Sequence, residues 1–205
     1  MQEDAATPLS PPSRYSAVAI TLHWIIALLI LDNIVIGLRM ESLKGLDKFV
    51  VFQWHKSIGL TVLLFSLARL AWRLTHRPPP YPADLKRWER VSAHAVHWLF
   101  YVLMIGLPLT GWIIVSASPL NLPTRLYNVV PWPHIGFVHH LPMAQRKAVG
   151  EAFESTHVVL AFTAIALIVL HVGAALKHQF WDKDGDLWRM APLKLFRPAP
   201  PAVEK

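Results

Sequence analysis

Cysteine is absent from this 205-residue chain, and charged residues are scarce, at 16%. Without cysteine the chain has no thiolate metal ligand, no disulfide and no covalent thioether attachment for a haem. The low charge accompanies 54% hydrophobic residues and a positive mean hydropathy of +0.37. This composition is typical of an integral membrane protein, because a soluble domain of this size carries more charge.

Four long apolar runs cover residues 17–38, 50–70, 94–116 and 155–176. Each reaches or exceeds the roughly 20 residues that a helix needs to cross a bilayer. The sequence therefore predicts an all-α fold, an integral membrane four-helix up-and-down bundle. We expect an N-terminal tail at 1–16, a transmembrane domain at 17–179 and a C-terminal tail at 180–205 that frays.

The net charge of +7 could indicate a nucleic-acid partner, but in a multi-pass protein the positions of Lys and Arg matter more than their sum. With the N-terminus in the cytoplasm, thirteen of the twenty basic residues fall on the cytoplasmic side. They are Arg14, Arg69, Arg73, Arg77, Lys86, Arg87, Arg90, Lys177, Lys183, Arg189, Lys194, Arg197 and Lys205. We therefore expect both termini in the cytoplasm and membrane lipid, not nucleic acid, around the chain.

The longest connection, residues 117–154, lies on the outer side in this arrangement. Its stretch LYNVVPWPHIGFVHHLP has no helical spacing, so we expect a partly irregular cap anchored at the membrane interface by Trp132. The cap is either an ordinary amphipathic loop or a guide for a substrate. Its histidines, His134, His139 and His140, make a weak zinc site without carboxylate or thiolate help.

Two histidines stand out in the fourth apolar run. His157 and His171 are fourteen residues apart, which is about 1400° of helix, or four turns less roughly 40°. Both imidazoles therefore lie on one face, about 21 Å apart. An imidazole at membrane depth needs a strong partner, because an unpaired polar group in hydrocarbon is costly. Haem iron is such a partner.

Antiparallel spans place the other histidines at matching heights. His55, near the start of the second span, lies at the outer level with His157. At the inner level His171 is matched by either His23 or His97, and spacing alone does not choose between them. Two levels with a histidine pair each suit two six-coordinate b-type haems.

Four further residues are placed by the same spacing. Gly37, fourteen residues after His23, leaves room for an outer haem, and Gly59 allows close approach near His55; helix packing would explain both glycines equally well. Arg69, fourteen residues after His55, faces the inner level, where it could pair a haem propionate. Asp32 lies on the opposite face of the first helix from His23 and is a functional candidate without a named partner.

These segments together resemble the bacterial cytochrome b561 family over about Tyr15 to Met190. The matching segments are LHWIIALLIL, FQWHKSIGLTVLLFSLARLAWR, HRPPPYP, VHWLFYVLMIGLPLTGW, STHVVLAF and LHVGAALKHQFWDKDGDLWRM. The resemblance implies a four-helix cytochrome b domain in the bacterial inner membrane with two b-type haems (heme b) per chain. Carried over residue by residue, it implies the iron ligands His23, His55, His157 and His171, and makes His97 a non-ligand.

The resemblance also implies electron transfer between a donor on the periplasmic side, with superoxide as a candidate, and ubiquinone in the membrane. A superoxide:ubiquinone oxidoreductase is the enzyme class it suggests. The alternative is an anchor subunit that relays electrons for a docked hydrogenase or dehydrogenase. The outer segments have a formal charge of +3, which could steer superoxide, and their test residues are Lys56, Arg125, Arg146 and Lys147.

Overall fold

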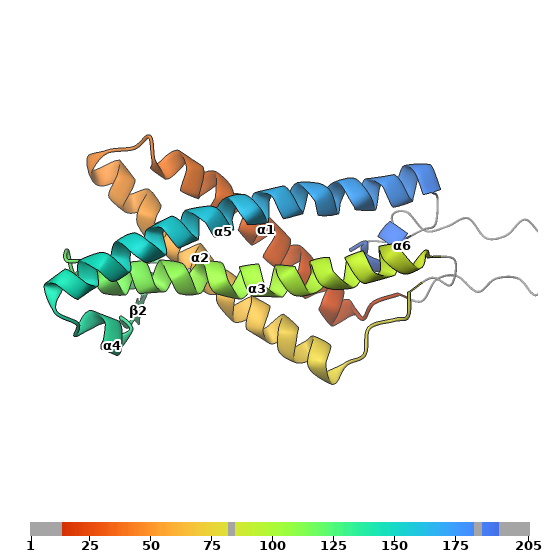
Figure 1. Ribbon diagram of the computed structural model, residues 1–205, viewed down its shortest axis with the longest axis horizontal. Helices are drawn as coiled ribbons and strands as arrows, with labels where there is room; N and C mark the ends of the chain where they lie inside the picture. Colours follow the sequence, from red (N-terminus) through yellow and green to blue (C-terminus); the bar gives the residue numbers. More distant parts are fainter. Residues whose placement is uncertain (1–13, 82–84, 183–185, 193–205) are drawn as a thin grey trace, which may run out of the picture.

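The computed structural model describes residues 14–81, 85–182 and 186–192. Its four long helices are α1 (Ala17–Met40), α2 (Gly45–Thr75), α3 (Arg87–Ala117) and α5 (Met143–Lys177). Each is long and apolar enough to cross a membrane. The helices run alternately in opposite directions along the long axis of the molecule (Figure 1). The predicted four-helix membrane bundle is confirmed.

The helices extend well beyond the apolar runs. Only residues 41–44 separate α1 from α2, although the first two apolar runs are eleven residues apart, and α5 begins twelve residues before the fourth apolar run, at Met143. The expectation of a loop up to residue 154 was therefore wrong. Polar turns such as AQRKAVGE continue a helix outside the bilayer, where hydropathy gives no signal of their conformation.

Local signals explain where two of these helices begin and end. The Ser16 side chain accepts a hydrogen bond from the Ala19 amide and caps α1. Helix α2 ends at Thr75, and His76 is already extended ahead of the three prolines at 78–80, as proline chemistry predicts. Helix α3 continues through Pro108, which removes one backbone donor from its interior.

The bundle consists of two helix pairs. Helix α1 packs along α2, and α3 packs along α5, while α2 and α3 join the pairs. In contrast, α5 has little or no backbone contact with α1 or α2. Each pair has a buried apolar cluster of its own, around Ile26, Ile58 and Val62 in the first and Leu103, Ala164 and Leu167 in the second. Helix α5 therefore faces α1 and α2 mainly through side chains.

One end of the bundle, which we call the hairpin end, carries the connection between α3 and α5 (Figure 1). Strands β1 (Thr124–Leu126) and β2 (Val130–Trp132) form an antiparallel hairpin, followed by the short helix α4 (Gly136–His139). The turn has positive φ at Tyr127 and Asn128. The Ser57 hydroxyl of α2 accepts a hydrogen bond from the Tyr127 amide at 3.0 Å. The cap is thus more regular than predicted, and it is docked on α2.

At the opposite end, which we call the terminal end, the described chain begins and ends (Figure 1). After α5, a π-helical turn (His178–Asp182) precedes α6 (Asp186–Met190). Buried Arg189 donates to the Pro80 carbonyl at 2.6 Å, and Trp24 of α1 donates to the Met190 carbonyl at 2.7 Å. Arg14 donates to the Ala191 carbonyl. The prediction that the tail frays from residue 180 was therefore wrong for residues 186–192.

Candidate functional site

Two pairs of imidazoles lie inside the bundle, one toward each end. His55 of α2 and His157 of α5 form the hairpin-end pair, with ring centroids 6.2 Å apart. His23 of α1 and His171 of α5 form the terminal-end pair, with centroids 6.3 Å apart. The structure therefore brings together the histidines that the spacing matched in height.

The distance within each pair fits a single metal ion held between two imidazoles. A bond of about 2.0 Å to one nitrogen of each ring, with each centroid roughly 1.1 Å behind its nitrogen, gives centroids about 6.2 Å apart. Direct stacking or hydrogen bonding between the rings would not require this separation. Both pairs thus fit the six-coordinate haem iron expected from the sequence.

The positions of the helices add a second test of fit. Each pair joins α5 to α1 or α2, the two helices that α5 barely touches. A macrocycle needs such a separation of backbones on both sides of its iron. The pairs therefore lie where the backbone of α5 stands apart from those of α1 and α2.

The hairpin-end pair is closely surrounded by residues that shape it. A Cβ atom added to Gly37 would lie 3.1 Å from His55 Cε1, so only glycine leaves that ring in place. A Cβ at Gly111 would lie 3.5 Å from His157 Cε1, which is ordinary van der Waals contact. Thr110 Oγ1 lies 2.8 Å from His157 Nδ1. The prediction that Gly37 lies at the level of His55 is confirmed.

The terminal-end pair has a cationic neighbour. Arg69 Nη1 lies 2.8 Å from His23 Nδ1, and because guanidinium only donates, the imidazole nitrogen accepts. A neutral His23 in this contact carries its proton on Nε2. Arg69 thus lies at the level of His23 and His171, as its spacing from His55 predicts, and it is hydrogen-bonded to His23. Phe100 packs edge-on against His171, with centroids 5.2 Å apart.

His97 of α3 also lies close to His171, with centroids 6.2 Å apart. Distance alone therefore does not separate His97 from His23 as a partner. However, α3 packs along α5, with Phe100 of α3 edge-on against His171, whereas α1 and α5 have little backbone contact. The packing favours His23, and His97 Nδ1 is buried without a hydrogen bond in the described part of the chain.

The four basic residues expected to form an outer cationic surface have different environments. Lys56 is buried, 8% exposed, and donates to Thr124 Oγ1 at 3.2 Å, so it supplies no surface charge. Arg146 is partly buried and donates to the Ser118 carbonyl. Lys147 is exposed and lies 3.9 Å from Glu151, and Arg125 is exposed. Only two of the four thus present their charge to solvent.

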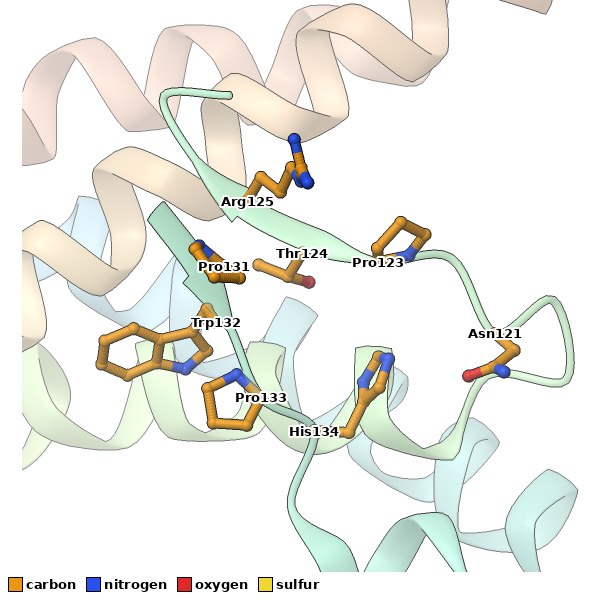
Figure 2. Close-up of a pocket in the computed structure, with 8 residues that line it drawn as sticks. All are labelled: Asn121, Pro123, Thr124, Arg125, Pro131, Trp132, Pro133 and His134. Atoms are coloured by element: carbon orange, nitrogen blue, oxygen red, sulfur yellow. The ribbon is translucent and has the colours of Figure 1, made fainter. Parts of the chain in front are cut away.

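A hollow of about 380 Å³ lies at the hairpin. Figure 2 shows its lining side chains, with Arg125 and Thr124 on opposite faces of β1. The lining residues are Asn121, Pro123, Thr124, Arg125, Pro131, Trp132, Pro133 and His134. Trp132 packs edge-on against Trp112 of α3, with centroids 5.4 Å apart, so it binds the cap to the bundle.

The three histidines of the cap do not gather into a metal site. Stacked His134 and His139 have centroids 4.8 Å apart, and His140 packs edge-on against His139. Within residues 14–81, 85–182 and 186–192, no group of three or more His, Asp or Glu side chains could hold a metal ion. Partial burial, then His139, Lys56 and Arg146, lower the pKa of His134, which keeps this ring uncharged near neutral pH.

Asp32 and Gly59 are also placed by the structure. Asp32 is exposed on the outside of α1, away from the histidine pairs. A Cβ at Gly59 would meet Asn33 Nδ2 at 3.5 Å, which is ordinary contact between α2 and α1. Gly59 is therefore a helix-packing residue, the simpler of its two interpretations.

Thr110 and Gly111 were not predicted as site residues. Both lie in the segment LPLTGW of α3, and none of the four paired histidines comes from that helix. In the sequence, the only sign of their role is one hydroxyl residue followed by a glycine within an apolar run. Assigning it to His157 requires the packing of α3 on α5, which the sequence alone does not provide.

Known proteins share this sequence over most of its length. The family model for prokaryotic cytochrome b561 matches residues 14–192. "Cytochrome b561 homolog 2" of Escherichia coli (strain K12) is 29% identical over 181 residues, covering 87% of this chain and 92% of that protein. "Probable superoxide oxidase CybB" of Yersinia pestis is 27% identical over 187 residues, covering 88% and 97%. The matched region includes both histidine pairs and all four long helices, and the chain belongs to the prokaryotic cytochrome b561 family, whose members are haem-binding membrane proteins of electron transport.

Proposed function

We propose that the chain is a diheme cytochrome that transfers electrons between a periplasmic donor and ubiquinone in the bacterial inner membrane. His55 and His157 bind one haem iron, and His23 and His171 bind the other. The observation that carries the proposal is the pair of imidazole separations, 6.2 and 6.3 Å, across helices that barely touch. When bound, a b-type haem supplies one-electron redox chemistry.

The residues of the site favour electron transfer over chemistry at the metal. With a histidine pair holding each haem iron, no position on the iron would be left open for oxygen. The protein's tasks are to hold both irons in the bundle, to exclude water and to tune their potentials. The two levels are about 21 Å apart along α5, which spans much of the roughly 30 Å hydrocarbon core.

Arg69 has two roles in this proposal. In its contact with His23 Nδ1 it opposes ligation, because the proton of a neutral His23 then occupies Nε2. With the guanidinium turned away, the proton of His23 could move from Nε2 to Nδ1 and leave Nε2 free as an iron ligand, and Arg69 would be available to pair a haem propionate. Arg69 is thus a cofactor-binding residue that changes partner on loading.

Superoxide is the donor that we propose, with the hairpin end facing the periplasm. The support is the "superoxide oxidase" in the name of one relative and the exposed charges of Arg125 and Lys147 beside the hairpin. Two superoxide ions each lose one electron and leave as O2, and one ubiquinone takes both electrons and two protons to become ubiquinol. Cationic surface would speed the encounter at low ionic strength.

The test uses the purified chain in lipid nanodiscs with ubiquinone. We expect two haems per chain by pyridine haemochrome, rapid reduction of the b-type bands by superoxide, and slower reduction at high salt. A Lys147→Gln variant should lose part of that salt dependence. Absence of haem would refute the proposal, and absence of a salt effect would refute the steering. Copurification of a hydrogenase or dehydrogenase subunit, with no turnover of the isolated chain, would instead identify an anchor subunit.

A further inference from the structure

Thr110 makes two hydrogen-bond contacts beside the hairpin-end pair. Its side chain is buried, 7% exposed, in α3. The hydroxyl donates to the Leu107 carbonyl at 2.7 Å, one turn earlier in the same helix, and lies 2.8 Å from His157 Nδ1. The Leu107 backbone is also a hydrogen-bond partner of the His157 ring.

The proton count of these contacts fixes the state of His157. A threonine hydroxyl has one proton, and here Leu107 takes it. Thr110 Oγ1 can then only accept from Nδ1, which must carry the imidazole proton. A neutral imidazole with its proton on Nδ1 has a lone pair on Nε2. This is the tautomer that binds a metal through Nε2.

The next residue along α3 supports the same orientation. A Cβ at Gly111 would lie 3.5 Å from Cε1 and 3.8 Å from Nδ1 of His157, so this glycine borders the same part of the ring that Thr110 contacts. Thr110 and Gly111 thus both lie beside the Nδ1 and Cε1 atoms of one imidazole. In the terminal-end pair the direction of the hydrogen bond is the opposite: Nδ1 of His23 accepts a hydrogen bond from Arg69.

We propose that Thr110 is a positioning residue that holds His157 in its iron-binding tautomer and increases the electron donation of that ligand. This inference rests on the proposed function, since it needs a haem at the hairpin-end pair. An acceptor on Nδ1–H makes the ligating imidazole more basic. A more basic ligand stabilises ferric iron more than ferrous iron and lowers the reduction potential of that haem.

The experiment compares redox titrations of the full chain carrying Thr110→Val, Thr110→Ser or Thr163→Val. Valine keeps the shape and removes the hydroxyl, and serine restores the hydroxyl. Thr163 of α5 is the matched control, because its hydroxyl makes a similar contact, to the Val159 carbonyl at 2.8 Å, on an exposed face. A His55→Ala variant identifies the hairpin-end component by its loss.

We expect Thr110→Val to raise the reduction potential of the hairpin-end haem. The largest shift expected is about 59 mV, which corresponds to a tenfold change in the one-electron equilibrium between ferric and ferrous iron. The other haem should not shift, and Thr110→Ser and Thr163→Val should resemble the unmodified chain. The retention of the hairpin-end haem during purification should fall about 10- to 100-fold in Thr110→Val, as for other partners of metal ligands.

Unchanged potentials in Thr110→Val, equal shifts of both haems, or a Thr110→Ser variant that behaves like Thr110→Val would each overturn the inference. If Thr110→Val does not accumulate, Thr110→Ala replaces it under the same criteria. Haem stoichiometry of the unmodified chain is measured first. Fewer than two haems there contradicts the proposed function itself, whereas two haems with an unmoved potential contradicts only the role of Thr110.

Discussion

The two histidine pairs differ in how the surrounding residues prepare them for a metal. At the hairpin end, Thr110 holds Nδ1 of His157, and Gly37 and Gly111 leave space for the two rings. At the terminal end, Arg69 occupies Nδ1 of His23 and favours the tautomer that does not bind iron. One site is thus arranged for ligation in advance, while the other requires a side chain to move. We infer that the hairpin-end site loads first.

The largest expected effect separates the two sites outright. His157→Ala should remove the hairpin-end haem and His171→Ala the terminal-end haem, each lowering the content from two haems per chain to one. Pyridine haemochrome against protein concentration measures this. Loss of both haems or of neither in either variant would break the two-site comparison.

A smaller effect should follow Gly37→Ala and be confined to the hairpin end. The added methyl lies 3.1 Å from His55 Cε1, so the ring must shift, at a cost of about 1–3 kcal/mol for overpacking. We expect weaker retention of one haem and a changed low-spin EPR signal for it. Gly173→Ala is the control, since a Cβ there has no neighbour within 4 Å in the described structure. Equal losses in both variants would argue against a specific contact with His55.

Arg69→Gln should act only at the terminal end. Removing a positive charge near iron stabilises the ferric state, so the potential of that haem should fall, by roughly 59 mV if the charge effect is tenfold. Loading of that haem into the purified apo chain should also become faster, because His23 no longer has to release a guanidinium. Potentiometric titration and stopped-flow haem binding check these outcomes. A shift at the other haem alone would reverse our assignment of Arg69.

The smallest effect is expected for His97→Ala. His97 is as close to His171 as His23 is, but it comes from α3, which packs directly on α5. The variant should therefore keep two haems with low-spin spectra close to those of the unmodified chain, and His23→Ala should not. Should His97→Ala lose the terminal-end haem while His23→Ala retains it, the two histidines exchange roles.

The sequence predicts the framework of this site better than its immediate surroundings. The apolar runs give four spans, and helix periodicity gives the heights of His55, His157 and His171, because both depend on local geometry. The choice between His23 and His97 depends on which helices pack together, which periodicity does not encode. The same holds for Thr110, whose partner is 47 residues away.

The hairpin shows a different limit. Its strands have three residues each and contain Pro131, and the turn uses Tyr127 and Asn128 at positive φ instead of a typical glycine. Helix α2 holds this hairpin at its turn, where the hydroxyls of Ser57 and Thr61 bond the backbone amide and the hydroxyl of Tyr127. Tertiary contacts of this kind override a weak local signal.

The separation of the bundle into two apolar clusters has a consequence for the life of the protein in the cell. Each helix pair has its own apolar cluster, and the two pairs meet mainly through α2 and α3, which leaves α5 with little backbone contact to α1 and α2. Under the proposed function, haem bound at the two histidine pairs would join α5 to α1 and α2 and so add to the contact between the helix pairs. Because a molecule that binds only the native state stabilises it by mass action, porphyrin supply would set how much of the protein escapes membrane proteases and accumulates.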